Sequence, residues 1–93
     1  MAIFLKDPAA RLDYAIDWQA VYLDGQTIVL SQWDVVPDAA GGIIVSDAGH
    51  DGGRAVVTLA GGLRGMRYQI TNRVTLSDGR SDERSLDVRV EDR

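Results

Sequence analysis

The segment YQITNRVTLSDGRSDERSLDVRV, residues 68–90, decides how this chain folds, because it holds two alternating runs on either side of a turn signal. From Met66 to Leu76 nearly every second residue is apolar, and arginine, glutamine and threonine fill the positions between them. After the letters SDGR, apolar residues again occupy every second position up to Val90. A period of two with one apolar face is typical of a β-strand. The segment therefore predicts two strands joined in a hairpin.

The turn of this hairpin limits its register. A two-residue loop, Asp78-Gly79, would place Ile70 opposite Asp87, which the alternation of buried and exposed positions forbids. A three-residue loop, with Gly79 in the left-handed position of a bulge, instead pairs Ile70 with Leu86. We expect this second arrangement.

One feature of the expected register is unfavourable. The three-residue loop also places Arg67 opposite Arg89, and like charges in that position destabilise a pair of strands. A longer loop, which shifts the pairing by two residues, would separate the two arginines. Both registers keep the apolar residues of the two strands on one face, so the alternative stays open.

Shorter patterns predict the other strands. In the run LDYAIDWQAVYL, one face is predicted to carry Leu12, Tyr14, Ile16 and Trp18. In IVLSQWDVV, the predicted shared face is Val29, Trp33 and Val35. Pro37 ends that strand, because proline cannot donate a hydrogen bond to a ladder. The β-branched runs GIIVS and AVVTL, both bounded by glycines, are also typical of strands.

These patterns predict the fold class and the domain organisation. Six to seven short strands, with turns at intervals of about 8–12 residues, indicate an all-β fold, a single immunoglobulin-like antiparallel β-sandwich. We expect residues 12–93 to form this domain and residues 1–11 to precede it as an N-terminal arm or edge strand. The 93 residues contain no cysteine, so packing, with or without partner subunits, must stabilise so small a domain.

Composition excludes several classes of protein. A net charge of −4 argues against nucleic acid as a ligand, because that binding depends on neutralising phosphates. No apolar run approaches the roughly 18–20 residues of a membrane span, and the N-terminus does not have the pattern of a signal peptide. We therefore expect no nucleic-acid and no membrane partner, and a location in the cytoplasm or in an assembly built there.

The sequence offers little for catalysis or for cofactors. His50 is the only histidine, and it lies in a glycine-rich stretch predicted to be a loop, where a catalytic group would be poorly held. Asp47 and Asp51 suggest a calcium loop, but the spacing of an EF-hand is absent; turn-forming aspartates explain them more simply. No phosphate-binding loop is found. We expect no enzymatic activity, no metal and no cofactor.

Two features are candidates for contact with a partner. Asn72 is polar on an otherwise apolar face, which predicts either a buried amide bonded within the core or a contact to another chain. Ile3, Phe4 and Leu5 precede the first regular strand, and the sandwich pattern does not need them. They are predicted either to dock on a neighbouring subunit or to form an ordinary edge strand packed on the chain's own core.

Three stretches resemble a known family. KDPAARLDYAIDW, DGQTIVLSQWDVV and YQITNRVTLSDGRSDERSL are similar, in this order, to the motifs of the phage fiber-tail adaptor proteins, small virion proteins of tailed phages. The likeness runs from Lys6 to about Val90, and the middle stretch PDAAGGIIVSDAGHDGGRA departs most from it. The resemblance implies an immunoglobulin-like sandwich without enzymatic residues.

The resemblance also implies a function. It predicts a structural virion component, assembled in the host cytoplasm, that links tail, fibre or other virion proteins and is oligomeric in the particle. A capsid decoration or cement protein is the alternative from the same virion. A carbohydrate-binding module is a third possibility, but the six aromatic residues, most of them predicted to face inward, leave few for a stacking platform.

Overall fold

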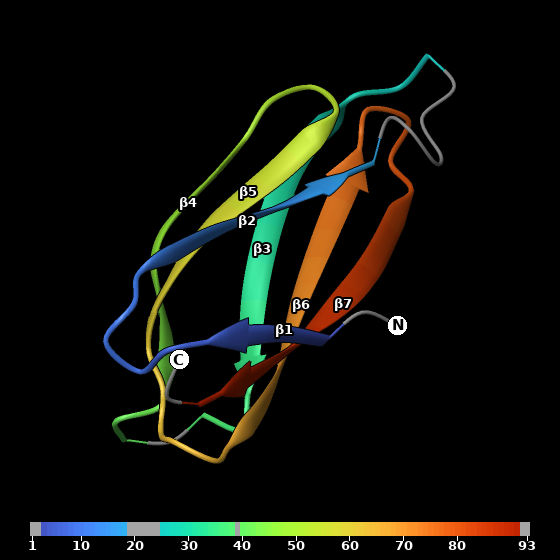
Figure 1. Ribbon diagram of the computed structural model, residues 1–93. Helices are drawn as coiled ribbons and strands as arrows, with labels where there is room; N and C mark the ends of the chain where they lie inside the picture. Colours follow the sequence, from blue (N-terminus) through green and yellow to red (C-terminus); the bar gives the residue numbers. More distant parts are fainter. Residues whose placement is uncertain (1–2, 19–24, 39, 92–93) are drawn as a thin grey trace.

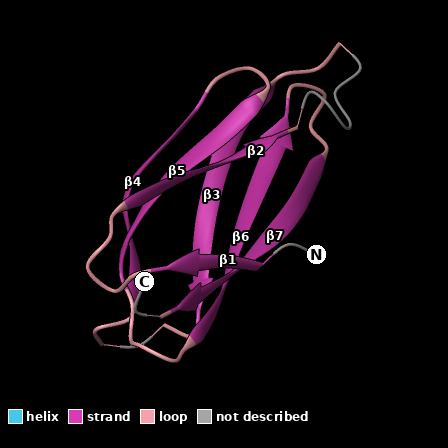
Figure 2. Ribbon diagram, in the orientation of Figure 1, coloured by secondary structure: helices cyan, strands magenta, loops and turns pink. Residues whose placement is uncertain are grey.

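Two β-sheets make up the described part of the chain, which is residues 3–18, 25–38 and 40–91 of a computed structural model. The strands are β1 (Ile3–Lys6), β2 (Leu12–Asp17), β3 (Ile28–Val36), β4 (Ile43–His50), β5 (Arg54–Gly61), β6 (Arg67–Leu76) and β7 (Ser81–Val90). One sheet has the order β1-β7-β6-β3 and the other β2-β5-β4 (Figure 1). The described residues contain strands and loops but no helix (Figure 2), so the predicted all-β class is confirmed.

The core lies between the two sheets and follows the alternation of the sequence. The four-stranded sheet contributes the buried apolar residues Ile28, Tyr68, Ile70, Val74, Leu76, Leu86, Val88 and Val90. The three-stranded sheet and the residue that follows β2 contribute Ile16, Trp18, Ile43, Ala55, Val57 and Leu59. Burying a large apolar side chain stabilises a fold by about 1.5–3 kcal/mol, and these two sets of residues therefore hold the sheets together.

The β6–β7 hairpin has the register that we expected from the three-residue loop. Ile70 pairs with Leu86, and Gly79 has a φ of +90°, a conformation that glycine adopts without steric cost. Leu76 N–H donates to the Arg80 carbonyl over 2.7 Å and closes the loop. The longer loop is therefore not formed.

The two arginines do lie opposite one another in this register, and each forms an ion pair with a different acidic residue. Arg67 and Arg89 are opposite one another. Arg67 lies 3.6 Å from the Asp87 carboxylate, and Arg89 lies 2.8 Å from that of Glu91. The acidic neighbours thus offset the repulsion that argued against this register.

Two predicted inward positions are wrong. Val29 is 56% exposed, because a bulge between Ile28 and Leu30 shifts the register of β3 against β6; Ile28 is buried in its place. Met66 is 37% exposed, because β6 begins one residue later, at Arg67. A bulge is not visible in an alternating pattern, since it adds one residue to one strand only.

The prediction of a wholly antiparallel arrangement is also wrong at one edge. β1 pairs in parallel with β7, so that Ile3 lies beside Asp87 and Lys6 beside Val90. The remaining pairs are antiparallel. In β2, Ile16 and Trp18 are buried as expected, and the predicted continuation of this strand over residues 19–23 lies outside the described residues.

Candidate functional site

Asn72 lies in the core and is completely buried. Trp18 Nε1–H donates to Asn72 Oδ1 over 2.9 Å. Asn72 Nδ2 donates to Ser31 Oγ over 2.9 Å and to the Gln32 carbonyl over 3.0 Å. The amide therefore uses both of its donors and its acceptor and ties β6 to β3 and to the residue after β2. These contacts are those expected of a buried core amide, and the predicted contact of Asn72 with a partner chain stays a prediction.

An arginine lies over the Trp18 ring, next to Asn72. Arg84 pairs with Asn72 across the hairpin, and its guanidinium lies 5.7 Å from the centre of the Trp18 ring. A cation at this distance from an indole face is attracted by the ring electrons. Trp18, only 1% exposed, is therefore covered by a charged residue that the alternation places on the inner face.

β1 is an edge strand whose three apolar residues remain partly exposed. Ile3 is 49%, Phe4 39% and Leu5 43% exposed. Phe4 lies beside Val88, and its ring meets that of Tyr14 edge-on at 5.3 Å between centroids. Because successive side chains of a strand point to opposite faces, Ile3 and Leu5 lie on the outer face. The strand thus contacts Tyr14 through Phe4 and presents an apolar surface through Ile3 and Leu5.

Lys6, the last residue of β1, is a buried cation that sequence reasoning missed. It has no exposed surface, and its Nζ donates to the Gly61 carbonyl over 2.6 Å and to the Asp7 carbonyl over 3.0 Å. Burial lowers the pKa of Lys6, and the negative charge of Asp7 partly opposes that shift. Since Gly61 belongs to β5, this contact connects the two sheets. A lone lysine before Asp-Pro gives no sequence signal of burial.

The β4–β5 turn is held by an aspartate, as the turn interpretation predicted. Asp51 Oδ1 accepts hydrogen bonds from the N–H groups of Gly53 and Arg54, each over 2.8 Å, and these bonds hold its pKa below the ordinary value. His50, predicted to lie in a loop, is instead the last residue of β4 and is exposed. Among the described residues no three histidine, cysteine or acidic side chains gather where they could hold a metal ion.

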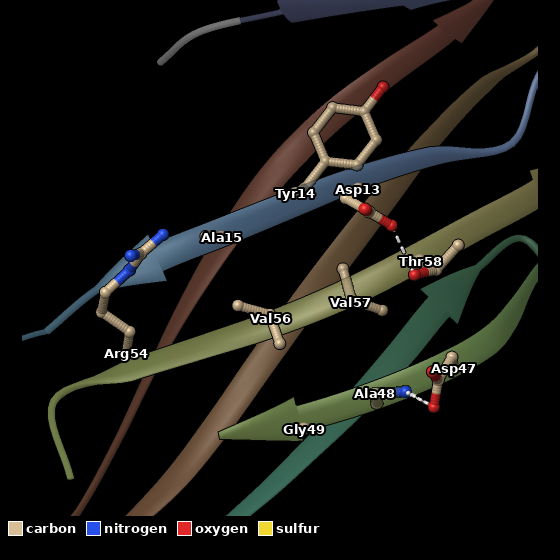
Figure 3. Close-up of a pocket in the computed structure, with 10 residues that line it drawn as sticks. All are labelled: Asp13, Tyr14, Ala15, Asp47, Ala48, Gly49, Arg54, Val56, Val57 and Thr58. Atoms are coloured by element: carbon tan, nitrogen blue, oxygen red, sulfur yellow. Dashed lines mark hydrogen bonds between the residues drawn. The ribbon is translucent and has the colours of Figure 1, made fainter. Parts of the chain in front are cut away.

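A hollow of about 470 Å³ lies on the outer face of the three-stranded sheet (Figure 3). It is lined by Asp13, Tyr14, Ala15, Asp47, Ala48, Gly49, Arg54, Val56, Val57 and Thr58. Sequence reasoning missed it, because the hollow depends on which residues of β2, β5 and β4 become neighbours. The register places Ala15 and Gly49 on either side of Val56, and these three small residues form its floor.

The rim of the hollow is charged and polar. Thr58 Oγ1 donates to Asp13 Oδ1 over 2.5 Å, which leaves that hydroxyl engaged. Asp47 Oδ1 accepts from the neighbouring Ala48 N–H over 2.9 Å. Arg54 borders the other end (Figure 3). An apolar floor between charged groups is suited to a side chain of another molecule.

Comparison with known proteins identifies one family. The family model described as podophage GP4 fiber-tail adaptor protein gp77 matches residues 6–89, which include β2 to β6 and nearly all of β7. The match leaves out the exposed residues of β1. A search of curated proteins finds no match. Where the chain is described, it has no helix of the length and apolarity that crossing a membrane requires.

Proposed function

The chain belongs to the podophage GP4 fiber-tail adaptor protein gp77 family, and from this premise we propose that it links the tail of a phage particle to its fibres. The family match over residues 6–89 carries the proposal. Family membership gives the chain a structural role in a phage, in contact with other tail or fibre proteins. In our proposal it acts without catalysis or cofactor and is present in several copies in the assembled particle.

We also propose that the fold is immunoglobulin-like. The antiparallel strand orders β2-β5-β4 and β3-β6-β7 correspond to the orders B-E-D and C-F-G of immunoglobulin domains. Tyr68, near the start of β6, accepts a hydrogen bond on its hydroxyl from the Leu63 N–H over 3.0 Å, which resembles the tyrosine corner of that fold. In this proposal residues 12–93 make up the immunoglobulin-like domain, and the N-terminal segment 1–11 contributes its edge strand, β1.

The outer surface of β1 is the docking surface that we propose for a neighbouring virion subunit. Ile3 and Leu5 expose 49% and 43% of their surfaces at the edge of the four-stranded sheet, and exposed edges are the places where another chain can add. Phe4 belongs to the same segment, but its ring contacts Tyr14.

The position of the protein in the particle tests the adaptor role. Antibody labelling of intact particles in the electron microscope should place the chain where tail and fibre meet. Label on the head would support capsid decoration instead, and particles without label would exclude both roles.

A pair of exposed substitutions tests the docking surface. Ile3→Ser with Leu5→Ser should leave the chain folded, because Phe4 and Lys6 are kept, and should strongly reduce incorporation into particles. The matched control is Val29→Ser with Leu30→Ser, two residues of β3 that are 56% and 49% exposed; it should be incorporated normally. Normal incorporation of the β1 variant would show that the chain docks elsewhere.

A further inference from the structure

The hollow on the three-stranded sheet is apolar at its centre. Val56 lies on the middle strand, β5, and is 40% exposed. Its cross-strand neighbours on the two sides are Ala15 and Gly49, which are too short to cover it. The next positions along the outer face, toward the two ends of β5, are Thr58 and Arg54. The small central row between larger side chains is therefore what creates the hollow.

The backbone conformation at position 49 does not require a glycine. Its φ is not positive, and a Cβ built on it would lie 3.8 Å from Val56 Cγ2, an ordinary contact distance. A Cβ is therefore accommodated at this position. Glycine within a strand weakens the strand and often marks a place where another molecule approaches. The effect of Gly49 is to keep Val56 accessible.

The charges at one end of the hollow indicate what it binds. Asp13 and Asp47 pair with Thr58 from its two sides, so their Cα atoms are roughly 10 Å apart, twice the spacing between strands. Both aspartates are exposed, and within the described chain neither has a cation within ion-pair distance. The nearby Arg11 donates from Nε to Ser46 Oγ instead, over 3.3 Å. Two negative charges thus face the space above Thr58.

We propose that this hollow binds a basic side chain, best an arginine, on a segment of a neighbouring protein in the particle. The aliphatic part of that side chain lies over Val56 and Ala15, and its guanidinium lies between Asp13 and Asp47. Arg54, at the far end, repels the cation and so directs it toward the aspartates. Two carboxylates fall short of the six to eight oxygen ligands of calcium, whereas an arginine suits both the apolar floor and the acids.

This inference rests on the proposed adaptor role in one respect: an adaptor needs two contact surfaces. β1 lies at the edge of the four-stranded sheet, and the hollow lies on the outer face of the three-stranded sheet. The two surfaces belong to different sheets, so the chain could hold one partner on each. The hollow supplies the second contact.

A titration of the full chain followed by amide NMR tests the site. N-acetyl-arginine methylamide, at millimolar concentrations, should shift the amide signals of Ala15, Gly49 and Val56, and the uncharged citrulline analogue should not. Asp13→Asn with Asp47→Asn should weaken binding roughly tenfold, as expected for two exposed charge contacts. Asp34→Asn with Asp38→Asn removes the same charge from two exposed positions elsewhere and should leave binding unchanged.

A second variant tests the floor independently of charge. A Cβ at position 49 stands at an ordinary contact distance from Val56, and valine favours a strand, so Gly49→Val should unfold at the same or a higher temperature than the original chain. It should nevertheless lose the arginine-induced shifts, because the new side chain fills the hollow. Equal binding by Gly49→Val, or by the double asparagine variant, would overturn the proposal, as would shifts spread over the whole surface.

The result does not depend on the proposed location of the protein. The titration uses the free chain, so a failure there bears on the hollow alone. A failure of the adaptor role would appear in the antibody labelling of particles, whatever the hollow binds.

Discussion

The β6–β7 hairpin and β1 are neighbours in one sheet, yet they are held in different ways. The hairpin pairs Arg67–Thr75 with Ser81–Arg89 across a short loop and buries most of its inner face. β1 pairs over four residues, in parallel, and leaves three of them substantially exposed. Its fourth residue, Lys6, binds carbonyl groups instead of packing as an apolar residue would. The hairpin is the part that stabilises the fold, and β1 is the part that we propose for docking on a partner.

Tyr68→Ala would damage the hairpin side of this comparison most. The ring is fully buried, and such a truncation typically costs about 3–5 kcal/mol of a total stability of about 5–15 kcal/mol. We expect the variant to unfold or to show a much lower denaturation midpoint. Tyr68→Phe, which removes only the hydroxyl bonded to Leu63, should lose about 1 kcal/mol. An unchanged denaturation curve for the alanine variant would contradict the central place of the hairpin.

Asn72→Leu has the next largest expected effect. The side chain keeps its approximate volume but leaves Trp18 Nε1 and the Gln32 carbonyl without the bonds they now make. An unpaired buried polar group costs about 1–3 kcal/mol, which chemical denaturation would measure. Combining it with Trp18→Phe, which removes the unpaired donor, should cost less than the sum of the two single changes. Strict additivity would argue that the Trp18–Asn72 bond contributes nothing.

The main effect expected of Lys6→Met is a change in how the stability of the chain depends on pH. Burial lowers the pKa of Lys6 below the ordinary value of 10.5, so the folded chain binds fewer protons than the unfolded chain between the lowered pKa and 10.5. Stability contributed by this residue therefore rises with pH across that window. Methionine should remove the rise. If denaturation midpoints of both proteins follow the same course up to pH 10, the lysine titrates as it would in water.

Glu83→Gln should have the smallest effect. The Arg73–Glu83 pair lies on the outer face of the hairpin at 2.9 Å, with both side chains more than half exposed, and exposed pairs contribute about 0.2–1 kcal/mol. The loss should be measurable at low salt and vanish at high salt. A loss as large as that of Asn72→Leu would mean that the outer face, too, supports the fold.

The same contrast explains what could be predicted from the sequence. The register of the hairpin followed from alternation and from a glycine in the turn, because both strands and their connection are local. The parallel pairing of β1 with β7 joins residues at the two ends of the chain, and no local pattern specifies it. The bulge after Ile28 was missed for a related reason, since it appears only against the partner strand β6.

The candidate sites were less predictable than the fold. Apolar residues at 3–5 were identified as unneeded by the core, and they are exposed on β1. Predicting the hollow would have required the registers of three strands at once. One signal was nevertheless present: Gly49 lies within a stretch that the structure shows to be strand. The burial of Lys6 could not be predicted from the sequence. Its ammonium group donates to backbone carbonyl groups, and these are present in every sequence.

The parallel pairing of β1 with β7 has a mechanical consequence. Ile3 and Val90 lie at opposite ends of the paired segment, so a force that pulls them apart along the strands is directed along the ladder. Such a force shears all the backbone hydrogen bonds of β1 together, whereas a force across the strands would open them one after another. The contact of Lys6 with Gly61 lies at the far end of the same segment and would have to break in the same event. Tension along this axis would therefore meet the greatest resistance that so short a strand can offer.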